Sequence, residues 1–115
     1  MIKVKRVYEP ASGVDGFRIL VDRLWPRALS RDKAQADLWL KEISPSHKLR
    51  KWYAHDPQRW QGFKKEYRKE LTAKKELVRQ IKRAEKENGV VTLLFAAKDA
   101  KRNNAVLLKE FVQES

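Results

Sequence analysis

Charged side chains follow two short apolar segments of this sequence, and their types are suited to binding an anion. The first segment, residues 19–21, is followed by Asp22, Arg23 and Arg27, and the second, residues 90–97, is followed by Lys98. Arginine offers a planar fork that matches phosphate or carboxylate, and lysine offers a compact charge. A carboxylate among these cations could act as a general base or contact a metal ion. The pattern predicts a site for a small phosphate- or carboxylate-bearing ligand, with Asp22 as the candidate catalytic residue and Arg23, Arg27 and Lys98 as ligand-binding residues.

Two further side chains are candidates for ligand binding at the same place. Trp25 stands between Arg23 and Arg27, so its ring could form a wall of a pocket. Asn103 lies where the last helix is expected to begin, and backbone N–H groups at a helix start can also hold an anion. A structural interpretation stays open beside this one. Asp22 could simply pair with Arg23 or Lys98, and Trp25 could belong to the core.

The predicted strands and helices that carry these residues indicate an α/β fold. Residues 2–7 alternate apolar and basic side chains, as in a half-exposed strand, and residues 17–22 and 90–97 resemble buried strands. Residues 37–43 are ambiguous, and we favour a third strand there. Strands separated by amphipathic helices indicate a small, mainly parallel sheet of three to four strands covered by helices, in a Rossmann-like three-layer arrangement. We expect residues 1–115 to form one domain.

Helix signals fill the rest of the chain. Ser30 could begin a short helical turn over 31–35, Ser46 a second helix, and the pair Asp56-Pro57 a third. Thr72 is a possible N-cap for the next helix, which Asn88-Gly89 would end. The apolar stripe of the third helix consists of Trp60, Phe63, Tyr67 and Leu71. Asn103 or Asn104 is expected to cap the last helix.

The charge balance opens an alternative function. The 27 Lys and Arg outnumber the 15 Asp and Glu, which gives a formal net charge of +12 that attracts polyanions. Residues 64–86 hold ten of these basic residues and four Glu. They could track nucleic-acid phosphates, so a nucleic-acid-associated binding module is the alternative hypothesis, or they could be the solvated side of amphipathic helices.

Several kinds of chemistry find no support in the composition. The chain has no cysteine, which excludes disulfides, cysteine-ligated zinc and a cysteine nucleophile. His47 and His55 form no paired ligand motif, and His55 beside Asp56 suits a hydrogen-bonding role at a helix start better than that of a general base. The four glycines make no phosphate loop. We therefore predict no metal and no cofactor, and leave open whether the protein is an enzyme.

The longest nearly apolar segment, residues 90–97, is too short to cross a bilayer. No apolar signal core is present at the N-terminus. We expect a cytoplasmic protein without a membrane partner. The oligomeric state is not predicted.

Four segments carry a resemblance to a known family. They are FRILVDRLWPR at 17–27, DLWLKEISPS at 37–46, LRKWYAHDP at 49–57 and TLLFAAKD at 92–99. With them, nearly the whole chain resembles the YeaO-like bacterial proteins, the family of domain of unknown function 488. Ala28 stands where glycine is typical in that family, which bears on the local turn. The resemblance implies a cytosolic bacterial α/β protein and supplies no established catalytic residues.

Overall fold

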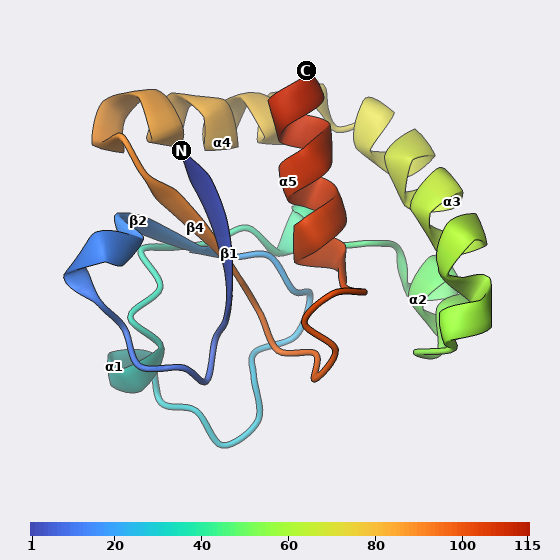
Figure 1. The fold of residues 1–115 in the computed structure, drawn as a ribbon, viewed down its shortest axis with the longest axis horizontal. Helices are drawn as coiled ribbons and strands as arrows, with labels where there is room; N and C mark the ends of the chain where they lie inside the picture. Colours follow the sequence, from blue (N-terminus) through green and yellow to red (C-terminus); the bar gives the residue numbers. More distant parts are fainter.

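The protein is built on a four-stranded parallel sheet, as a computed structural model that describes residues 1–115 shows (Figure 1). The strands are β1 (Ile2–Arg6), β2 (Phe17–Leu20), β3 (Leu38–Trp39) and β4 (Val91–Phe95), in the spatial order β1-β4-β2-β3. β4 is central and pairs with β1 from Ile2 opposite Val91 to Arg6 opposite Phe95. It also pairs with β2, which pairs with β3 at the edge. The predicted α/β class with a parallel sheet is confirmed.

Helices cover the sheet unequally. They are α1 (Arg31–Ala34), α2 (His47–Tyr53), α3 (Trp60–Thr72), α4 (Lys75–Asn88) and α5 (Asn104–Glu114). The larger core cluster joins Ile19 and Leu93 of the sheet to apolar side chains of α2, α3, α4 and α5. The next residues along the strands, Leu20 and Leu94, belong to a smaller cluster with Ala34 of α1 on the opposite face. The third layer is therefore only α1 and the loops beside it.

Most helix starts follow the predicted capping residues. Ser30, Ser46 and Asn103 each accept a hydrogen bond from a backbone N–H in the first turn of α1, α2 and α5. Asp56 instead caps a 3-10 turn, Pro57–Arg59, that leads into α3. Gly89, with φ of 79°, ends α4 as expected.

Two local predictions need correction. Thr72 does not cap α4: it is the last residue of α3, and its hydroxyl donates to the Arg68 carbonyl one turn earlier at 2.9 Å. The strand predicted at 37–43 shrinks to Leu38–Trp39, because the chain turns at Leu40 and forms a 3-10 turn at Lys41–Ile43. The Leu40 N–H still donates to the Leu20 carbonyl at 2.9 Å, and this is where the pairing with β2 ends.

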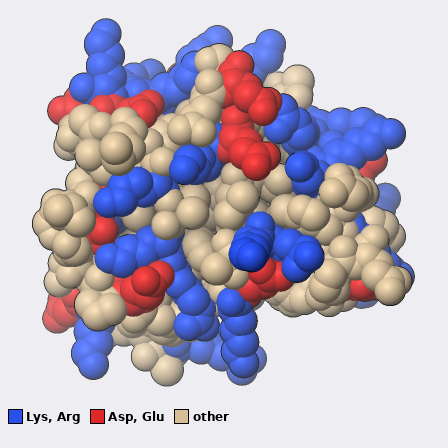
Figure 2. Space-filling model, in the orientation of Figure 1, with Lys and Arg blue, Asp and Glu red and all other residues tan.

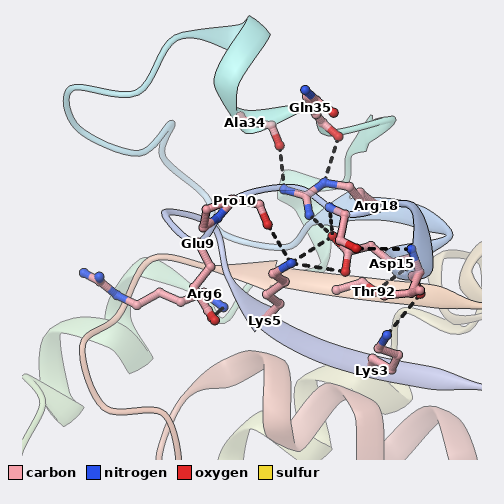
Figure 3. Close-up of polar contacts among 12 residues, drawn as sticks. Lys3, Lys5, Arg6, Glu9, Pro10, Asp15, Arg18, Ala34, Gln35 and Thr92 are labelled. Carbon is pink, nitrogen blue, oxygen red and sulfur yellow. Dashed lines mark hydrogen bonds and ion pairs between the residues drawn. The ribbon is translucent and has the colours of Figure 1, made fainter.

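A buried ion network that the sequence did not predict holds the thin side of the sheet (Figure 3). The Asp15 carboxylate lies 2.5 Å from Arg18 Nη1 and 3.1 Å from Lys5 Nζ. Arg18 also donates to the carbonyls of Gln35 at 3.0 Å and Ala34 at 2.7 Å. Burial raises the pKa of Asp15, but hydrogen bonds from the Ser12 amide, Lys5 and Arg18 outweigh it and lower that pKa below its usual value. The network ties the loop after β1 to β2 and α1.

Ala28 adopts a left-handed backbone, with φ of 55°. A side chain with a Cβ is strained in this region, whereas glycine is not. Ala28 is therefore a strained link between the segment after β2 and α1.

None of the helices combines the length and the apolar character needed to cross a membrane.

Candidate functional site

A cleft of about 1070 Å³ opens at the carboxyl edge of the sheet. Because all strands run in the same direction, the segments that follow β1, β2 and β4 leave the sheet at this edge. Residues 22–27 after β2 and 96–99 after β4 line the cleft. Side chains of α2 and α3 and the start of α5 complete it.

All six residues predicted for the site line this one cleft: Asp22, Arg23, Trp25, Arg27, Lys98 and Asn103. Arg23 and Lys98 come from different strand ends and lie in the same cavity rather than on opposite faces of the sheet. Their individual surroundings divide the six into structural residues and residues with free hydrogen-bonding groups.

Asp22 ties two strand ends together. Its carboxylate accepts a hydrogen bond from the Ala96 N–H at 2.9 Å, and the Asn104 side chain beside it donates to the Val21 carbonyl at 3.1 Å. Burial raises the pKa of Asp22, although the Ala96 amide, Asn104 and the charge of Arg50 oppose this rise. Asp22 forms no ion pair with Arg23 or Lys98. Its carboxylate links the ends of β2 and β4.

Asn103 is occupied by the loop that precedes α5. Its Oδ1 accepts from the Val106 N–H at 3.0 Å, and its Nδ2 donates to the Asp99 carbonyl at 3.0 Å. The Asp99 carboxylate accepts from the N–H groups of Lys101 and Arg102, and these bonds lower the pKa of Asp99. Asn103 therefore shapes the cleft, and its side-chain oxygen and nitrogen each already form a hydrogen bond to the backbone.

Trp25 serves both the core and the cleft wall. Its ring meets Trp39 edge-on at 5.5 Å, and its Nε1 donates to the Leu29 carbonyl at 2.7 Å. The Arg31 guanidinium lies 4.6 Å from the ring centroid. The half-buried indole packs on the thin side of the sheet and also lines the cleft.

Arg23 has an unsatisfied donor. Its Nη1 lies 3.5 Å from a carboxylate oxygen of Glu42, but its Nε is buried and has no hydrogen-bond partner. A buried donor without an acceptor costs about 1–3 kcal/mol. Arg27 and Lys98 are exposed and take part in none of the ion pairs of the protein. Arg27 and Lys98 are therefore available to an acceptor in the cleft, and Arg23 lines the cleft with a donor that has no partner in the protein.

The structure adds residues that the sequence analysis missed: Arg6, Arg50, Tyr53 and Arg102. Arg6 ends β1, so the strand-end argument could have included it. Arg50 and Tyr53 come from α2, which reaches the sheet edge only through tertiary packing. The Tyr53 side chain is 7% exposed, and its hydroxyl forms no hydrogen bond, whereas the buried Tyr67 hydroxyl donates to the Ile43 carbonyl at 2.7 Å.

The cleft carries an excess of positive charge. Six cationic side chains line it, against the carboxylates of Asp22 and Asp99, which accept hydrogen bonds from backbone N–H groups. The clustering of cations on walls of low polarity strengthens attraction for an anion.

The basic helices present a different surface. Arg79 pairs with Glu76 at 2.8 Å, Lys69 with Glu66 at 3.5 Å, and Arg68 with Glu114. Figure 2 shows Lys and Arg spread over the visible face and interspersed with Asp and Glu. Carboxylates thus pair with some of the basic residues of α3 and α4.

No group of three or more His, Asp or Glu side chains is arranged to hold a metal ion.

Comparison with known proteins finds similarity along the whole chain. Residues 1–115 match the family model described as "Inactive DUF488-N3 subclade". The chain is 38% identical over 112 residues to "Uncharacterized protein YeaO" of Escherichia coli strain K12, covering 97% of this chain and 96% of that protein. It is 35% identical over 111 residues to "Uncharacterized protein Rv3073c" of Mycobacterium tuberculosis strain H37Rv, covering 96% and 92%. No solved structure matches.

Proposed function

We propose that this chain, which belongs to the YeaO-like DUF488 proteins and within them to the inactive DUF488-N3 subclade, binds a small anionic ligand in the cleft at the carboxyl edge of the sheet. The ligand carries a phosphate or a carboxylate, and the protein holds it without turning it over.

The buried Nε of Arg23 is the observation that carries the proposal. Arg23 is one of six cationic side chains that line the cleft, and its buried Nε lacks an acceptor. A ligand oxygen would remove the cost of that unsatisfied donor and gain a charge-assisted hydrogen bond. Arg27 and Lys98 would add charges that no carboxylate of the protein neutralises.

Binding without turnover fits the chemistry of the residues present. Asp22, the candidate general base, is engaged by the Ala96 N–H and lies beside Asn104. The chain has no cysteine nucleophile. The description of the matching subclade as inactive agrees with both points.

A nucleic-acid-binding role receives less support. The basic side chains of α3 and α4 are interspersed with glutamates and partly paired with them. A protein that binds nucleic acid through phosphates needs many unpaired cations along one face.

The test is calorimetric titration with inorganic phosphate and with malonate at low salt. We expect saturable binding at one site and a loss of about tenfold or more in Arg23→Gln, as suits the loss of a charged hydrogen bond. The matched control is Arg79→Gln, which removes the same charge from the outer side of α4 and should leave the affinity unchanged. Equal losses in both variants, or no binding of either anion, would refute the proposal. Tight, salt-sensitive binding of duplex DNA or of RNA with no anion binding would favour the alternative.

A further inference from the structure

The size of the cleft points to a ligand much larger than a simple anion. Inorganic phosphate has only five non-hydrogen atoms, whereas pockets that bind drug-sized ligands measure about 300–1,000 Å³. The cleft measures about 1070 Å³. A nucleoside monophosphate, with roughly 23 non-hydrogen atoms, is of the size that such pockets bind. Most of the cleft must therefore receive a part of the ligand other than its anionic group.

Aromatic rings line this remaining volume from two sides. Tyr8 and Trp25 come from the segments after β1 and β2, and Tyr53, His55 and Phe63 come from α2, α3 and their connection. Figure 1 shows α2 and α3 on the opposite side of the β4 end from the segment that follows β1. A space bordered by rings on both sides suits a flat, conjugated group.

Among the Tyr, Trp and Phe rings of the cleft only Tyr8 is exposed, so such a group would stack on the face of Tyr8 that Arg6 leaves open. Tyr8 is 37% exposed, and the Arg6 guanidinium lies over the ring at 4.7 Å from its centroid. Its hydroxyl donates to the Arg27 carbonyl at 2.9 Å, which fixes the ring beside one of the unpaired cations. A planar group against Tyr8 would thus lie next to the anion-binding side chains.

Free polar groups lie on both sides of the cleft. Arg23 Nε is unsatisfied on the strand side, and on the α2 side the Tyr53 hydroxyl is open to solvent and has no hydrogen-bond partner in the protein, although the rest of the residue is buried. A ligand with acceptors at both places, such as a phosphate oxygen and a ring heteroatom, would bond to both groups.

From the proposed anion site and these features, we infer that the ligand is a free nucleoside phosphate, with its phosphate at Arg23, Arg27 and Lys98 and its base between Tyr8 and Tyr53. This inference rests on the proposed function, because it places the phosphate in the same cleft.

The test compares ligands that differ by one part. Calorimetry on the full chain with AMP, GMP, CMP and UMP is set against ribose 5-phosphate, which lacks only the base, and inorganic phosphate. We expect at least one nucleotide to bind about tenfold or more tightly than ribose 5-phosphate, the range that base stacking on an aromatic side chain supplies. Tyr8→Leu should lower the nucleotide affinity to that of ribose 5-phosphate measured on the same variant, and Tyr53→Phe should weaken the nucleotide severalfold. Trp52→Leu, at an exposed ring outside the cleft, should change neither affinity.

The outcomes separate the two proposals. If phosphate and ribose 5-phosphate bind and no nucleotide binds more tightly, the nucleotide inference is refuted and the anion site stands. If none of these ligands binds, both are refuted. A short single-stranded oligonucleotide that binds about tenfold or more tightly than every mononucleotide would overturn the assignment to a free nucleotide. Circular dichroism of each variant establishes that a lost affinity does not come from unfolding.

Discussion

Replacement of Asp22 distinguishes a structural carboxylate from a catalytic one. In the wild type the Ala96 N–H lies 2.9 Å from the Asp22 carboxylate and donates to it. Asp22→Asn keeps a side-chain oxygen that can accept this hydrogen bond. It also removes a buried negative charge, whose burial raises the pKa of Asp22. We expect its stability to lie within about 1 kcal/mol of the wild type, or above it. Asp22→Ala leaves the Ala96 N–H without its acceptor and should cost about 1–3 kcal/mol.

The pH dependence of the stability difference between Asp22→Asn and the wild type provides the sharper test. Because the folded pKa of Asp22 is raised, the native state binds this proton more readily than the unfolded state does. Ionised Asp22 therefore destabilises the native state at neutral pH, and this cost disappears as the pH falls through the raised pKa towards the usual value of 3.8. The stability of Asp22→Asn relative to the wild type should be most favourable at neutral pH and decrease on acidification.

Urea unfolding followed by circular dichroism between pH 4 and pH 7 measures this difference. Anion titrations of the same variants measure the functional part, and Asp22→Asn should retain the phosphate affinity. A destabilisation of Asp22→Asn as large as that of Asp22→Ala would refute the reasoning. So would a relative stability that rises as the pH falls.

Three further predictions address the strained turn, the ion network and the cleft. Ala28→Gly should stabilise the protein by about 1 kcal/mol in thermal melts, because glycine adopts a φ of 55° without strain. The control Ala73→Gly, at a position where φ is −84°, should not stabilise it. Equal effects at both positions would contradict the argument. Arg18→Met should lower the free energy of unfolding in urea by about 3–5 kcal/mol, because it leaves Asp15 buried with Lys5 as its only cationic partner. The control Arg79→Met, at an exposed position, should change it by less than about 0.5 kcal/mol. A small loss in Arg18→Met would show that the network contributes little to stability. Glu42→Gln should tighten phosphate binding up to about fivefold, because the Glu42 carboxylate lies 3.5 Å from Arg23 and competes with the ligand for it. Unchanged or weaker phosphate binding in this variant would count against that competition.

The candidate site was partly predictable because strand ends in a parallel sheet meet at one edge. Asp22, Arg23 and Lys98 could be grouped by this rule alone, and all line the cleft. The rule cannot say which polar groups are free. Asn103 and Asp22 satisfy neighbouring backbone groups, a pairing that depends on distances between segments more than 70 residues apart in one case.

The amino-acid sequence by itself determined the local structure of this protein. Its apolar runs specified β2 and β4, and Ser30, Ser46 and Asn103 specified where helices begin, because hydrophobic periodicity and capping act between near neighbours. Only the tertiary structure decided that α2 brings Arg50 and Tyr53 to the carboxyl edge, that Asp15 and Arg18 form a buried pair, and that Arg23 Nε lacks an acceptor. These features arise from packing between distant segments, which leaves no periodic pattern along the chain.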